Sequence, residues 1–414
     1  MRDRSAQVRP GHFDASSRPV RLRIGVVAPA WLPVPPPGYG GIERVVSVLV
    51  EGLVASGHDV TLFAAAGSQT SARLVTPLAV APPLGELLAV TDDLVHTTTA
   101  FLRANEFDII HDHTGMGPAL GAMLHPRATV VHTLHGPWTE GSRRLIGLVH
   151  DRINLVAISR AQQASNPDLR YAGVVHNGID LDEYPLNTVK EDFVVFLGRI
   201  NAEKAPEIAV EVAHRAGLPL VMMVKRTEAA ERRYWDEVVA PCLHGDEIVL
   251  DQPPPEVKAD LLGRARAMLF PINWPEPFGL VMAESMACGT PVIARALGAA
   301  PEVISDGVTG FLCSSDDEMV EAVEAARELK PQECRAWAER RFSADAMVAG
   351  YEHIYRELLA DLVAGEAAVG TKSGQHRGSG TRRHGPPVAR AALNGAGTSG
   401  ISSRPDADPR PLAS

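Results

Sequence analysis

Two glutamates lie eight positions apart in the segment PEPFGLVMAESMACGTPVIA (275–294), Glu276 and Glu284. The Phe-Gly-Leu run between them is typical of a helix start. The first backbone N–H groups of a helix have no intrahelical partner, and the helix dipole there favours negative charge. We therefore expect the amides of Gly279 and Leu280 to cradle an anion that has a carboxylate on either side.

The carboxylates indicate what else that anion carries. Carboxylates repel phosphate, but they accept hydrogen bonds from the vicinal hydroxyls of sugars. A ligand with phosphates in its middle and sugars at both ends is a nucleotide-diphosphate sugar. The segment FLGRINAEKAP supplies cations for it, Arg199 and Lys204, and a charge-assisted hydrogen bond contributes roughly 1.5–3 kcal/mol. A surface ion pair between Glu203 and Lys204 remains an alternative interpretation.

Short apolar strands alternate with helical patterns on both sides of these residues. RLRIGVVAP (21–29) and HDVTLFAAA (58–66) enclose an apolar helical pattern that ends at Gly57, and a second series begins at 192–217. Such alternation predicts parallel strands with right-handed crossovers. We therefore predict an α/β protein with two Rossmann-like halves that join near 184–191. Ligands of such sheets bind at the carboxyl ends of the strands, where Arg199 and Glu276 fall.

Changes in composition set the expected domain boundaries. The last segment is rich in Gly, Ser, Pro and Arg, with few large apolar residues, so it cannot form a core. We expect a flexible leader (1–20), an N-terminal Rossmann-like domain (21–187), a C-terminal Rossmann-like domain that binds the nucleotide sugar (188–344), a terminal helix (345–364) and a disordered tail (365–414). Whether the terminal helix packs back on the N-terminal domain stays open.

Composition excludes several functional classes. A net charge of −10 argues against general nucleic-acid binding, which requires a basic face. No apolar run reaches the roughly 18–20 residues of a membrane span, so at most peripheral membrane contact is expected. The N-terminus has no apolar core of a secretory signal, and the four cysteines form no CxxC pair. A reduced, cytoplasmic enzyme fits these features.

Several motifs together resemble glycosyltransferase family 4. In the C-terminal half these are GRINAEK, the glutamate-pair segment and PEVISDGVTGFL. In the N-terminal half they are GYGGIE (38–43), TLHG (133–136) and VVHNGID (174–180). The resemblance covers about 21–360. It implies the GT-B fold, in which two Rossmann-like domains face a central cleft, and sugar transfer that retains the anomeric configuration.

The resemblance also implies roles on the donor side. Arg199 and Lys204 would neutralise the diphosphate of the donor and of the leaving group. Glu276 would face the transferred sugar, and Glu284 the nucleoside ribose. Phosphates and sugar hydroxyls would bind the backbone of three residues at the helix start, Phe278, Gly279 and Leu280.

The N-terminal half would complete the site. Gly40 and Gly41 would let their loop approach the diphosphate closely, because glycine has no side chain. His135 would lie near the anomeric carbon. The resemblance further implies front-face attack by the acceptor, with the departing phosphate helping as base, and no cofactor or metal. The acceptor stays open among sugar, lipid and small molecule, as do the donor's base and sugar.

The sequence departs from the family at two places. Ala205 and Pro206 follow the lysine where the family often has glycine, and proline is tolerated at the first position of a helix. The family's Gly-Asp-Gly loop is replaced by a segment with Lys225 and Arg226, which leaves open a phosphate or ribose contact or a solvated loop. This replacement puts the nucleotide of the donor in doubt.

Other patterns suggest different functions. The alternating histidines of HDH (111–113) suggest a metal, but no third ligand stands at a readable spacing. Two Asp-x-Asp matches, at 180–182 and 406–408, are read as chance. GYGG begins too far after its strand for a dehydrogenase. A catalytically silent nucleotide-sugar-binding scaffold and a nucleotide-sugar 2-epimerase remain the alternatives to a transferase.

Overall fold

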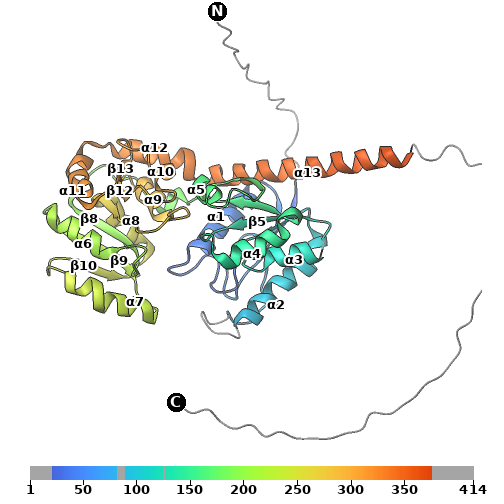
Figure 1. The fold of residues 1–414 in the computed structure, drawn as a ribbon, viewed down its shortest axis with the longest axis horizontal. Coiled ribbons are helices and arrows are strands. Elements are labelled where there is room, and N and C mark those ends of the chain that lie inside the picture. Colours follow the sequence, from blue (N-terminus) through green and yellow to red (C-terminus); the bar gives the residue numbers. More distant parts are fainter. Residues whose placement is uncertain (1–20, 82–88, 125, 375–414) are drawn as a thin grey trace, which may run out of the picture. The chain divides into compact units, whose positions relative to one another are not determined.

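The computed structural model describes residues 21–81, 89–124 and 126–374. The predicted leader and residues 375–414 of the predicted tail lie outside the described residues. The described strands form two sheets, and every strand pairing within them is parallel. The α/β class and the two-sheet organisation expected from the sequence are therefore confirmed (Figure 1).

The first sheet has seven strands in the order β3-β2-β1-β4-β5-β6-β7. Its strands are β1 (Arg23–Val27), β2 (Asp59–Phe63), β3 (Arg73–Val75), β4 (Ile109–Asp112), β5 (Thr129–Leu134), β6 (Asn154–Ala157) and β7 (Tyr171–Val174). The helices between them are α1 (Gly41–Ala55), α2 (Ala89–Leu102), α3 (Gly117–Leu124), α4 (Glu140–Val149) and α5 (Arg160–Ala164). Short helical turns follow at Ala104–Glu106, His150–Arg152 and Leu181–Glu183.

The second sheet has six strands in the order β10-β9-β8-β11-β12-β13. Its strands are β8 (Glu191–Arg199), β9 (Leu220–Lys225), β10 (Ile248–Asp251), β11 (Ala265–Phe270), β12 (Val292–Arg295) and β13 (Gly310–Cys313). The helices are α6 (Pro206–Arg215), α7 (Ala229–Tyr234), α8 (Pro255–Arg264), α9 (Leu280–Ala287), α10 (Ala300–Val303), α11 (Asp316–Ala325), α12 (Pro331–Phe342) and α13 (Ala344–Gly374), with short helical turns at Trp235–Val239, Ala240–Cys242 and Ala326–Glu328.

The strand order reverses once in each sheet, and Arg199 and Glu276 lie at that point of the second sheet. In the first sheet β1 lies between β2 and β4, and in the second β8 lies between β9 and β11. Ligands of open α/β sheets bind beyond the carboxyl ends of the strands at such switch points. Arg199 is the last residue of β8, and the loop that carries Glu276 leaves β11. The two therefore extend from adjacent strands.

Helix α13 begins within the core of the first sheet. Its residues Met347, Val348 and Tyr351 belong to the buried cluster of β1, β2 and α1. The hydroxyls of Tyr351 and Tyr355 lie 2.9 Å from Thr133 Oγ1 and 2.7 Å from His111 Nδ1. Parallel sheets are covered on both faces, so a helix from the far end of the chain fills the space that the crossovers leave.

Two sequence-based expectations need correction. The terminal helix, expected to end at 364, continues to Gly374, so the first ten residues of the expected disordered tail are helical. Glu366, Ala367 and Ala368 favour a helix, and extending an existing helix costs little. The sequence analysis also missed strand β3, whose three residues are mostly exposed and carry little apolar pattern. No described helix is both long and apolar enough for a membrane span.

Candidate functional site

The loop between β11 and α9 places the predicted anion cradle. Helix α9 begins at Leu280, and Gly279 caps it in the left-handed conformation with φ of +80°. A Cβ at Gly279 would lie 2.7 Å from the flexible end of Met282, so it is the left-handed backbone conformation that favours glycine here. Phe278 is 1% exposed and anchors the turn in the core. Met282 N donates to Gly279 O at 3.0 Å, and the helix geometry leaves the two amides before it, those of Leu280 and Val281, without an intrahelical acceptor.

Glu276 lies directly before this turn and is 9% exposed. Its carboxylate accepts a hydrogen bond from Trp274 Nε1 at 2.9 Å and forms an ion pair with Lys204. Its backbone O accepts from Ala299 N at 2.8 Å. At Gly298, φ is +56° and a Cβ would lie 2.3 Å from Glu276 N. The β12–α10 loop therefore packs against the backbone of Glu276 and fixes its position.

Lys204 belongs to the loop between β8 and α6. Its backbone N donates to Asn201 Oδ1 at 3.0 Å, and its Nζ lies 5.3 Å from the centroid of the Trp274 ring. The ammonium therefore pairs with Glu276, and the alternative pairing with Glu203 does not form. Glu203 instead accepts from Asn201 Nδ2 at 3.4 Å.

Ala205 adopts a left-handed conformation, with φ of +47°. This conformation costs a residue with a Cβ roughly 1–2 kcal/mol and costs glycine far less. This strain gives a physical reason why the family that the sequence resembles often has glycine at this position. Pro206 is the first residue of α6, as expected.

Arg199 is held by two carboxylates that the sequence analysis did not single out. Its Nε donates to Glu231 Oε1 at 2.7 Å, and its Nη2 donates to Glu228 Oε2 at 3.1 Å. Lys225 Nζ donates to both glutamates, at 2.8 Å to Glu228 and 3.1 Å to Glu231. Burial raises the pKa of the Glu231 carboxyl, but Arg199 and Lys225 outweigh it and leave the pKa below its ordinary value. The capping-box spacing Glu-x-x-Glu at the start of α7 was the sequence feature that could have pointed to these two glutamates.

Glu284 lies one turn into α9 and is 4% exposed. Its Oε1 accepts from Tyr184 Oη at 2.7 Å and from Lys258 Nζ at 3.1 Å. The ammonium of Lys258 also lies 2.8 Å from Tyr184 Oη and 5.0 Å from the centroid of its ring. One oxygen of Glu284 is thus engaged by the protein. Sequence reasoning missed both partners because they come from α8 and from the segment before β8.

Gly40 and Gly41 lie at the amino-terminal end of α1. A Cβ at Gly40 would lie 2.7 Å from Pro36 Cβ, so the turn requires glycine. A Cβ at Gly41 would lie 3.5 Å from Leu280 Cδ1, which brings this turn next to the start of α9. The structure therefore places the GYGG loop beside the predicted anion cradle.

His135 follows β5 and is half-buried. Its Nε2 lies 2.8 Å from His113 Nδ1, and the two rings stack with centroids 5.1 Å apart. Burial lowers the pKa of His135 to about 3, with a smaller contribution from His132. His132 Nδ1 lies 2.6 Å from Asp112 Oδ2. The HDH residues are therefore engaged in hydrogen bonds, and the described residues contain no group of three or more His, Cys, Asp or Glu side chains that could hold a metal ion.

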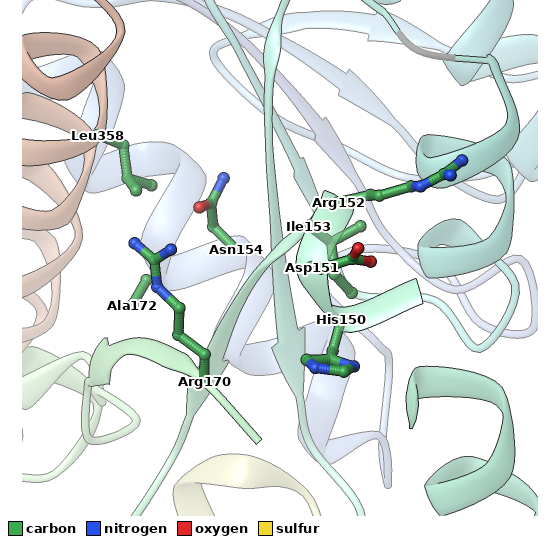
Figure 2. Close-up of a pocket in the computed structure, with 8 residues that line it drawn as sticks. All are labelled: His150, Asp151, Arg152, Ile153, Asn154, Arg170, Ala172 and Leu358. Atoms are coloured by element: carbon green, nitrogen blue, oxygen red, sulfur yellow. The ribbon is translucent and has the colours of Figure 1, made fainter. Parts of the chain in front are cut away.

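The site residues are only partly joined by direct contacts. Among the described residues, hydrogen bonds connect Lys204 with Glu276, while Arg199 and Glu284 each have separate partners. A pocket of about 220 Å³ lies elsewhere, around the amino-terminal ends of β6 and β7 (Figure 2). In Figure 2 the side chains of Asn154 and Arg170 extend beside Leu358 of α13. This pocket contains none of the predicted site residues.

Comparisons with known proteins identify the family. The model for Glycosyltransferase Family 4 matches residues 39–183, and the model for Glycosyl transferases group 1 matches residues 182–342. A D-inositol 3-phosphate glycosyltransferase of Mycobacterium avium (strain 104) is 30% identical over 300 residues, which cover 61% of this chain and 69% of that protein. The chain belongs to glycosyltransferase family 4.

Some relatives are matched over a smaller part of their own length. A D-inositol 3-phosphate glycosyltransferase of Mycobacterium sp. (strain KMS) is 29% identical over 250 residues. This match covers 51% of this chain and 56% of that relative, so the chain spans little more than half the length of the relative.

Solved structures share the fold. AviGT4, a glycosyltransferase involved in avilamycin A biosynthesis, is 28% identical with a TM-score of 0.64, over 82% of this chain and 98% of that one. The Anabaena protein HepE, solved in complex with UDP-glucose, is 18% identical with a TM-score of 0.61, over 83% of this chain and 100% of that one. The GT-B fold expected for a family 4 chain is thereby confirmed.

Proposed function

We propose that this protein is a retaining glycosyltransferase that moves a sugar from a nucleotide-diphosphate sugar to an acceptor without a metal ion. One observation carries the proposal. Lys204, Glu276 and the open amides of α9 lie together at the switch point of the second sheet. A cation and a helix end suit a diphosphate, and a carboxylate beside them suits sugar hydroxyls.

Binding of the donor would rearrange the ion pairs of the site. The diphosphate attracts Lys204, which frees Glu276 to accept hydrogen bonds from the transferred sugar. Arg199 stays anchored through Nε to Glu231 and offers its remaining N–H groups to the leaving phosphate. Glu284 keeps one oxygen on Tyr184 and Lys258 and offers the other to the ribose. Positive groups aimed at the developing phosphate charge lower the barrier of transfer.

Two comparisons with other proteins support this proposal, one for the donor and one for the acceptor. HepE shares the fold and was solved with UDP-glucose. The curated relatives are named D-inositol 3-phosphate glycosyltransferases, which makes a phosphorylated polyol the first acceptor to test. The reduced cysteines fit a cytoplasmic site of action.

The deciding experiment measures release of nucleoside diphosphate from UDP-, GDP- and ADP-sugars, with and without EDTA and with acceptor mixtures. We expect release from one donor, insensitive to chelation. Sugar analysis of the product separates transfer from 2-epimerisation, which leaves the nucleotide attached. Donor binding without release under any acceptor mixture would favour the silent scaffold. Loss of activity with EDTA would contradict metal independence.

A further inference from the structure

His113 and His135, which directly follow two neighbouring strands, are joined by a hydrogen bond between their rings. His113 comes directly after Asp112, the last residue of β4, and His135 comes directly after Leu134, the last residue of β5. The two strands pair in parallel, so both rings lie at the same edge of the sheet. The backbone N of His113 donates to Val27 O at 2.9 Å, which fixes its position.

The hydrogen bond between His113 Nδ1 and His135 Nε2 uses one proton, which one of the two nitrogens carries. Burial lowers the pKa of both imidazoles, that of His113 well below its ordinary value, so both rings are neutral near pH 7. A neutral imidazole carries one N–H, and the bond made by one ring nitrogen decides which form is present. Either His113 Nδ1–H donates to His135 Nε2, or His135 Nε2–H donates to His113 Nδ1.

The far nitrogen of His113 distinguishes these arrangements. His113 is 4% exposed, and its Nε2 is buried with no hydrogen-bond partner among the described residues. The groups that shift its pKa are three other histidines, His111, His135 and His132, and they include no carboxylate. In the first arrangement Nε2 is a buried acceptor without a donor, and in the second it is a buried N–H without an acceptor. Orphaned buried N–H groups are the rarer of the two in folded proteins. The proton therefore belongs on His113 Nδ1.

We propose that His113 is a positioning residue that holds His135 in the tautomer protonated at Nδ1. His135 Nε2 is then the acceptor, and its Nδ1–H is the donor that remains. No group among the described residues bonds to that nitrogen, and the ring is half-buried, so the N–H is available to a ligand. This inference rests on the proposed function: His135 donates a hydrogen bond to a hydroxyl of the transferred sugar and does not act as a base.

The tautomer is measured directly by two-bond ¹H–¹⁵N NMR of the imidazoles in the full chain at pH 7, without any donor. His135→Gln assigns the signals of residue 135. We expect a protonated Nδ1 and an unprotonated Nε2 in the wild type. His113→Asn keeps an N–H donor near the position of Nδ1, and His113→Leu has the same shape without it. We expect His135 to keep its form in the Asn variant and to lose it in the Leu variant.

Kinetics supply the second readout. We expect His113→Leu to lower kcat about fivefold to tenfold, the contribution of one hydrogen bond, with donor KM nearly unchanged, and His113→Asn to restore most of it. His353→Gln, an exposed change on α13, serves as the control for both readouts. An Nε2–H form of His135 in the wild type, or equal kcat in the Leu and Asn variants, would overturn the proposal. If no donor is turned over, the proposed function fails, and the NMR result still decides the tautomer.

Discussion

Lys204 and Glu276 lie 72 positions apart in the chain and form an ion pair at the start of α9. Their side chains are 18% and 11% exposed, so water screens the pair only partly. Trp274 contributes to both partners, since its indole N–H donates to Glu276 and its ring lies beside the ammonium of Lys204. The pair joins the β8–α6 loop to the β11–α9 loop at the predicted donor site.

Neutralising either partner is expected to lower turnover. Lys204→Met and Glu276→Gln should each reduce kcat/KM at least about tenfold, because each removes a charge-assisted bond to the donor. Each single change also leaves the other charge without its partner. The double variant should therefore recover thermal stability while activity stays low. Wild-type turnover in both single variants would refute the site assignment.

Gly298 is expected to be required for the position of Glu276. In Gly298→Ala the new Cβ meets the backbone of Glu276, so the loop must shift and kcat should fall about tenfold or more. Gly307→Ala is the matched control, because φ there is +71° and a Cβ would meet nothing within 4 Å. Both changes carry the left-handed strain of roughly 1–2 kcal/mol. Steady-state kinetics and thermal melts of the two variants separate the steric effect from the strain.

Lys258 is expected to make stability depend on pH through Glu284. Burial raises the pKa of Glu284, but the Lys258 charge and the bonds from Tyr184 and Lys258 bring it below its ordinary value. A lowered pKa stabilises the fold above the unfolded-state value of about 4.3, and that stability is lost as pH falls through the folded value. Lys258→Met removes the charge that lowers this pKa most and leaves the Tyr184 hydrogen bond and the Arg44 charge, so the pKa rises and the ionised carboxylate destabilises the fold.

The expected loss for Lys258→Met is about 3 kcal/mol in the free energy of unfolding at pH 7, shrinking toward zero near pH 3. Denaturant titrations between these pH values measure it. Lys330→Met changes an exposed lysine that, among the described residues, pairs with Glu333, and it should show a small loss at every pH. A loss of equal size at pH 3 and pH 7 would contradict the coupling between Lys258 and Glu284.

Only Cys242 is expected to react in the folded protein. It is exposed, whereas Cys288, Cys313 and Cys334 are buried. Burial raises the pKa of these three thiols, to about 12 for Cys288 and Cys334 and about 11 for Cys313. Titration with a thiol reagent at pH 8 should find one group per folded chain and four in denaturant. A fast-reacting thiol that persists in Cys242→Ser would contradict the burial of the other three.

The spacing of apolar residues and the glycines and prolines that end elements were enough to predict the helices and strands around the site. The start of α9 and the place of Arg199 at a strand end followed from patterns within about twenty residues. Strand β3 was missed because its three mostly exposed residues carry too little apolar pattern. The extension of α13 was missed because glycines and polar residues were read as the end of structure.

The sequence by itself determined which charges stand at strand ends and helix starts, because those positions depend on local periodicity. Only the tertiary structure decided which groups pair. Tyr184 meets Glu284 across 100 positions because the segment before β8 lies along α9, where Asn187 N donates to Cys288 O. His113 meets His135 across 22 positions because the parallel strands β4 and β5 end at the same edge of their sheet. Burial then makes each pairing consequential, since a buried charge or N–H without a partner is costly.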